Sequence, residues 1–123
     1  MRSFIFVCNR THPVQDMPRI QWCGSFFARL RGLMFRQDLG RDEGLLLANA
    51  SDSRLDASIH MLFVPFDLAV FWINSDMHVV DKLIARSWRP AYFPKDAARY
   101  TLEIHPDRFE DFSIGDQVEF QNA

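Results

Sequence analysis

Three ionisable residues lie in or beside apolar stretches, where such groups need a partner or a chemical task. His60 falls within the apolar run at residues 59–64, Asp67 directly precedes the run at residues 68–73, and Glu103 lies within a strand-like alternation. An imidazole in this setting could act as a general base or contact a ligand, and it could equally be a core histidine satisfied by hydrogen bonds. If the three side chains converge, they could support acid–base chemistry.

The segment at residues 29–36 contains three arginines that could pair with these acids. A carboxylate beside a buried strand is costly unless a cation or backbone amides bond to it. We therefore expect Asp67 to bond to an arginine of this segment or to backbone amides near it, and we assign no catalytic residue. The candidate ligand-binding residues are Arg31, Arg36, His60, Asp67 and Glu103.

The motifs of common cofactor and metal sites do not occur in the sequence. There is no P-loop, no G-x-G-x-x-G and no G-x-S-x-G. His60, His78 and His105 lack the spacing of metal ligands. We therefore predict neither a cofactor nor a metal.

Charge is distributed unevenly along the chain. Residues 1–41 contain seven arginines and two aspartates, whereas the remainder is acidic, and the formal net charge is −2. Phosphates need clustered Lys and Arg, but the acidic remainder would repel a polyanion. We expect the arginines to pair with the acids, and we predict no nucleic-acid partner.

No apolar stretch is long enough to span a bilayer, and the apolar run at residues 4–8 is too short for a signal peptide. We therefore predict a cytoplasmic protein with no membrane partner. Cys8 and Cys23 are too few for a disulfide framework. We still expect them to come close across a first hairpin and to remain thiols in a reducing cytoplasm.

The 123 residues suit one domain, spanning residues 1–123. Seven or so short strand patterns are separated by Pro, Gly and Asn turns. Ser25 can cap a helix whose apolar residues recur at helical spacing, and Pro106 can start a short helical turn. The sequence therefore predicts an α+β, mainly β fold. We expect a small twisted sheet curled into a partly open barrel, one main helix at about 25–35 and a short C-terminal helical turn at about 106–112.

Residues 68–73 are apolar at every position, so both faces of this strand must be covered. We expect residues 58–73 to form the stability centre, with Phe71 and Trp72 among its largest side chains. A functional site would then lie at the rim, where His60, Pro65 and Asp67 cluster.

Several segments resemble, in order, the markers of the family called domain of unknown function 192. That resemblance implies a small, mainly-β domain with a barrel-like sheet and no established biochemical activity. It runs from about residue 20 to about residue 120. The matching segments are residues 29–36, 44–47, 58–60, 65–68, 79–80, Trp88, 102–103 and 114–116.

The chain also departs from the family pattern. Residues 49–57 are longer than the usual connection, and Met77 or His78 replaces a glycine common in the turn near Asp76. Many relatives begin with a secretion or lipoprotein signal, and from this sequence we expect no such signal.

We favour a non-enzymatic binding or accessory domain that uses a barrel-rim cleft for a small ligand, a peptide or a protein partner. One alternative is a small hydrolase-type enzyme with His60 and Asp67 as its acid–base pair. The other is a purely structural module. A cleft in which the candidate residues converge would favour a ligand site, whereas a fully packed centre would favour the structural module.

Overall fold

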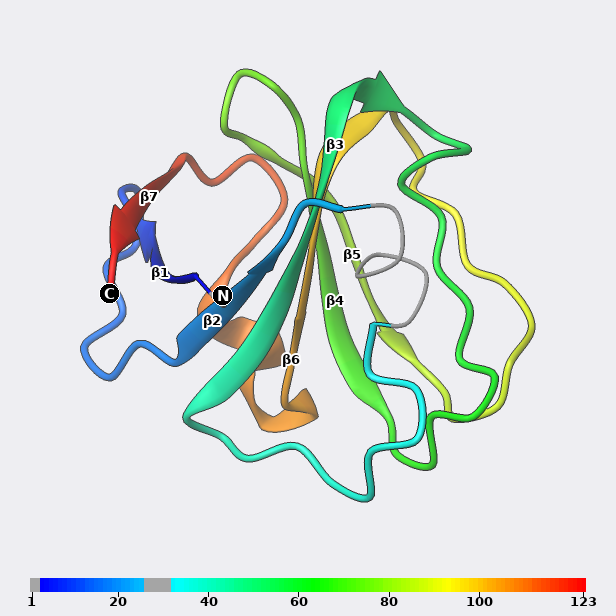
Figure 1. Cartoon of the computed structure of the whole chain (residues 1–123). Coiled ribbons are helices and arrows are strands. Elements are labelled where there is room, and N and C mark those ends of the chain that lie inside the picture. Colours follow the sequence, from blue (N-terminus) through cyan, green and yellow to red (C-terminus); the bar gives the residue numbers. More distant parts are fainter. Residues whose placement is uncertain (1–2, 26–31) are drawn as a thin grey trace.

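The computed structural model of the chain describes residues 3–25 and 32–123 and contains one seven-stranded sheet (Figure 1). The strand order is β5-β4-β6-β3-β2-β1-β7, and the sheet twists into a half-barrel. Only the β2–β3 pair is parallel among the described pairings. The strands are β1 (Phe4–Asn9), β2 (Arg19–Cys23), β3 (Glu43–Ser53), β4 (Leu68–Ile73), β5 (Val79–Ala85), β6 (Ala98–Ile104) and β7 (Val118–Asn122).

The sheet has a hydrophobic core on each face. One face packs Phe71, Leu102 and Ile104 against Phe112, which follows the 3-10 helix η1 (Pro106–Asp111). The opposite face packs Leu68, Val70 and Trp72 of β4, among others, under the loops that connect the strands. Figure 1 shows those loops, coloured cyan, green and yellow, on the side of the sheet away from β1 and β7.

Strand β4 is buried along its entire length, as its uninterrupted apolar sequence predicts. It lies between β5 and β6, and both pairings are antiparallel. The rest of the expected stability centre is irregular. Residues 59–64 form no strand, and Ile59 makes only an isolated bridge with Tyr92.

The prediction of an α+β fold with one main helix at about 25–35 is wrong. The described residues contain no helix of seven or more residues, and residues 32–35 form turns. Gly32 and Phe35 adopt φ angles of 48° and 66°, which a right-handed helix excludes. Residues 26–31 of that segment lie outside the described residues. The predicted C-terminal helical turn is η1, which is stabilised at its start by Pro106 and by the His105 side chain.

The expected approach of Cys8 and Cys23 is also wrong. Ile5 pairs with Ile20 in the antiparallel β1–β2 ladder, so the two cysteines lie at opposite ends of it. They are about 20 Å apart along the strands at the usual rise per residue. Cys8 lies opposite Glu119 of β7, and neither sulfur belongs to a disulfide.

Within the described part of the chain, no helix is long and apolar enough to cross a membrane.

Candidate functional site

A cavity of about 580 Å³ lies between one face of the sheet and the loops that cover it. Its floor comes from β3, β4 and β6, and its outer wall comes from three loops around residues 32–34, 56–64 and 90–91. This size is typical of small-molecule sites. The lining residues that the argument uses are Leu47, His60, Met61, Leu68, Thr101 and Glu103.

Hydrogen bonds from the sheet hold the central loop of the outer wall in place. The carbonyl oxygen of Ala57 accepts from Trp72 Nε1 at 2.8 Å and from Thr101 Oγ1 at 3.1 Å. Farther along, Ile59 exchanges two backbone hydrogen bonds with Tyr92. The loop that carries His60 is therefore fixed at the sheet and at the neighbouring loop.

An aromatic cluster joins the three loops of the outer wall on their exposed side. The ring centroids of Phe35 and Phe63 lie 5.1 Å apart, and those of Phe63 and Trp88 lie 5.2 Å apart. All three residues have positive φ angles, between 62° and 66°, which bulky residues rarely adopt. The backbone amide of Phe35 also donates to Phe63, and that of Trp88 donates to Met61. The cluster fixes the relative positions of the loops at the cost of local strain.

Glu103 is the most unusual residue of the cavity wall. It lies on the central strand β6, opposite Leu45 of β3 and Val70 of β4, and it is only 4% exposed. No hydrogen bond or charge from a described residue contributes to the pKa of its carboxyl group. Since no fully buried side-chain oxygen in the described part of the chain lacks a partner, the carboxyl oxygens are open to the cavity rather than sealed off. Burial therefore raises the pKa of the Glu103 carboxyl to about 7, and no charge or hydrogen bond opposes this effect.

Thr101 and His60 add polar atoms to the same cavity. Thr101 lies two residues before Glu103 on β6, so both side chains share one face of the sheet. His60 is half-buried, and its Nδ1 atom accepts a 3.2 Å hydrogen bond from the Leu62 amide. When neutral, the imidazole therefore carries its proton on Nε2.

Asp67 is paired, but not with the predicted segment. Its carboxylate accepts from the Ser87 backbone amide and from the Arg86 guanidinium, both at 2.9 Å. These bonds, the Ser87 bond first, lower the pKa of Asp67. Leu68 lies opposite Ala85, so the same antiparallel register places Asp67 opposite Arg86. Asp67 does not line the cavity.

Arg36 pairs with Glu43 at 2.6 Å and lines a different, more polar cavity beside β2. Arg31 lies outside the described residues. Of the predicted set, the structure thus brings His60 and Glu103 together around one cavity and leaves Asp67 and Arg36 elsewhere.

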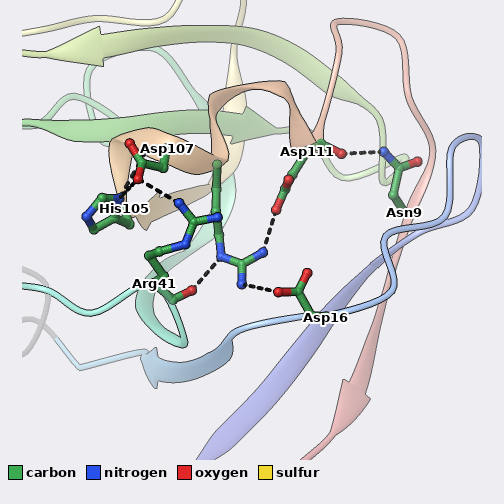
Figure 2. A network of polar contacts seen from close by, with 7 residues as sticks. Asn9, Asp16, Arg41, His105, Asp107 and Asp111 are labelled. Carbon is green, nitrogen blue, oxygen red and sulfur yellow. Dashed lines mark hydrogen bonds and ion pairs between the residues drawn. The ribbon is translucent and has the colours of Figure 1, made fainter.

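A second polar cluster surrounds Arg108 of η1, a buried charged residue whose guanidinium is paired within the fold (Figure 2). Arg108 is 4% exposed, like Glu103, but its guanidinium bonds to Asp111 at 2.9 Å, to Asp16 at 3.4 Å and to the carbonyl oxygen of Arg41. These bonds hold η1 against two loops. The contrast with the unpartnered Glu103 marks the cavity as the candidate site.

Sequence reasoning missed Thr101 and the depth of the cavity. One signal was present, since Thr101 and Glu103 are two polar residues on one face of a strand whose other face is apolar. In the described part of the chain, no group of three or more His, Cys, Asp or Glu side chains could hold a metal ion.

The protein is a small half-barrel sheet covered on one face by loops. Between the loops and the sheet lies a ligand-sized cavity, whose lining includes the buried carboxyl group of Glu103. Residues 7–120 match the family described as "Uncharacterized ACR", the domain of unknown function 192. The chain belongs to this family, as the resemblance in its sequence predicts.

Two archaeal relatives are proteins of unknown function named UPF0127. The one from Thermococcus sibiricus is 36% identical over 92% of this chain and 73% of its own length. The one from Thermococcus gammatolerans is 39% identical over 68% of this chain, which spans about half (53%) of that relative. A crystal structure of a protein of unknown function from Novosphingobium aromaticivorans has a TM-score of 0.79 at 18% identity, covering 96% of this chain and 84% of that one. It shares the fold. The names of these relatives state no specific function.

Proposed function

We propose that this protein is a non-enzymatic binding domain that holds a small ligand in the cavity above β6. The observation that carries the proposal is Glu103, a 4% exposed carboxyl group that lines this cavity and has no partner among the described residues. Burial of a carboxyl group carries a free-energy cost for its charged form, and here no charge or hydrogen bond opposes that cost. A ligand that bonds to the carboxyl group would offset that cost.

The alternatives have less support. His60 and Asp67 would have to act together in a hydrolase, yet His60 bonds to Leu62 and Asp67 bonds to Arg86 and Ser87. A purely structural module would be expected to fill its centre, and here the space remains open. The cytoplasmic location expected from the sequence is part of this proposal.

A bulky residue at the cavity rim should abolish ligand binding. Ala50 is an exposed residue of β3 that lines the cavity, so Trp at this position would occupy its space. Ala97 is also exposed but does not line the cavity, and Ala97→Trp is the matched control. We expect small organic fragments, screened by ligand-observed NMR, to bind the parent and Ala97→Trp but not Ala50→Trp.

Methyl resonances of Leu47, Met61 and Leu68 should shift with the bound fragments, since these side chains line the cavity. Fragments that bind all three proteins equally, or that bind none, would contradict the proposal. The variant His60→Ala, tested in the same screen, distinguishes a ligand-binding role from a structural one. Loss of fragment binding would show that His60 contacts the ligand, whereas loss of stability alone would show that His60 is structural.

A further inference from the structure

We propose that the cavity selects a small organic cation, an apolar body that carries a primary ammonium group, with Glu103 as its counter-ion. This inference rests on the proposed binding function and names the chemical class of the ligand.

Carboxyl groups outnumber cationic groups among the described residues that line the cavity. Among its described lining residues there is no lysine or arginine, and the ionisable groups are Asp56, His60 and Glu103. The strand neighbours of Glu103 are the apolar residues Leu45 and Val70, so no cation approaches it from β3 or β4. A partly enclosed cavity with acidic groups attracts cations and repels carboxylates and phosphates.

The two polar side chains that β6 contributes to the cavity, Thr101 and the ionised Glu103, can accept hydrogen bonds from a ligand. The ionised Glu103 carboxylate only accepts. The Thr101 hydroxyl donates its proton to the carbonyl oxygen of Ala57, at 3.1 Å, so its oxygen lone pairs remain for a ligand. An ammonium group is the complementary species, because it has three donors and no acceptor.

The remaining wall favours an organic ligand over a metal ion. Leu33, Leu47, Met61, Val64 and Leu68 supply apolar surface around the carboxyl group. Hard cations such as Ca²⁺ require six or more oxygen ligands, which these side chains do not offer. An ammonium group attached to a hydrocarbon body fits both parts of the cavity, because burial of the body adds favourable free energy.

Proton linkage follows from the same geometry. Burial raises the pKa of Glu103 to about 7, so the carboxyl group is largely protonated at pH 5.5 and largely ionised at pH 8. A cation binds the ionised form better. Its affinity should therefore increase from pH 5.5 to pH 8, whereas the affinity of a neutral ligand should not.

Three probes of one shape test the charge preference: cyclohexylmethylamine, cyclohexylmethanol and cyclohexanecarboxylate. Dissociation constants are measured by NMR titration at pH 5.5 and pH 8 with the parent, Glu103→Gln and Ala97→Trp. At pH 8 the parent and Ala97→Trp should bind the amine at least about tenfold more tightly than the alcohol, as expected for a charge-assisted hydrogen bond. Glu103→Gln should lose this preference and retain the alcohol.

The proposal is overturned if the carboxylate binds the parent as tightly as the amine, if Glu103→Gln keeps the preference, or if none of the probes binds. The pH dependence of amine binding to the parent needs no variant and is a second, independent readout. Alcohol binding that Ala50→Trp abolishes, without a preference for the amine, would retain the binding function and reject only the ligand class.

Discussion

Replacing Phe71 with Ala should lower the free energy of unfolding by about 3–5 kcal/mol. Phe71 is fully buried in β4, and its ring contacts Phe112 with centroids 5.0 Å apart. The substitution removes this contact and leaves a cavity between the sheet and η1 that neighbouring side chains fill only in part. Such a loss is a large share of the stability of a typical domain.

Chemical denaturation of parent and variant measures this loss. Phe93→Ala is the matched control, because Phe93 is 50% exposed and its truncation should change stability by about 0.5 kcal/mol or less. Equal losses in the two variants would show that β4 is not the centre of the core.

Replacing Glu103 with Gln should stabilise the protein at pH 8 by about 3 kcal/mol and should change its stability little at pH 5. The pKa of Glu103 rises from 4.5, its usual value, to about 7 in the folded protein because the group is buried. The folded state therefore binds more protons than the unfolded chain between these pH values. Stability falls as pH increases through this window and stays low above it. Gln has nearly the same shape and never ionises, so it escapes the penalty.

Urea denaturation at pH 5 and pH 8 tests this expectation. Asp67 and Asp116 do not obscure it. Burial of Asp116 opposes its ionisation, but hydrogen bonds lower the pKa of both carboxyl groups overall, so both remain ionised across this range. Glu110→Gln is the control, since the side chain of Glu110 is 86% exposed and should contribute little at either pH. A Glu103→Gln variant that loses stability at pH 8 would mean that the carboxylate has a partner in the fold.

The parts of the fold that follow from local sequence pattern could be predicted. The unbroken apolar run of β4 indicates a strand buried on both faces, and the structure confirms it. The expected helix fails because periodicity and the Ser25 cap do not reveal that Gly32 and Phe35 adopt positive φ angles. Residue spacing describes which side chains could share a helix face, but not where tertiary contacts bend the backbone.

The candidate site was predicted in part, for a related reason. His60 and Glu103 were identified by their apolar surroundings, but their common cavity depends on loops that meet only in the folded chain. The partner of Asp67 was missed, although the register of the β4–β5 hairpin determines it. Leu68 pairs with Ala85, so the residue before Leu68, Asp67, lies opposite the residue after Ala85, Arg86. Pairing this hairpin in the sequence would have indicated the Arg86 contact.

The most direct test of this account is a ¹³C NMR titration of the Glu103 carboxyl resonance, assigned by comparison with Glu103→Gln. Because the carboxyl group is buried at the cavity wall without a partner, we predict a midpoint near pH 7 in the ligand-free protein. Saturation with cyclohexylmethylamine should lower this midpoint, since a bound cation stabilises the ionised form. A midpoint near 4.5 without ligand would contradict the account, because it would show a carboxyl group already solvated or paired.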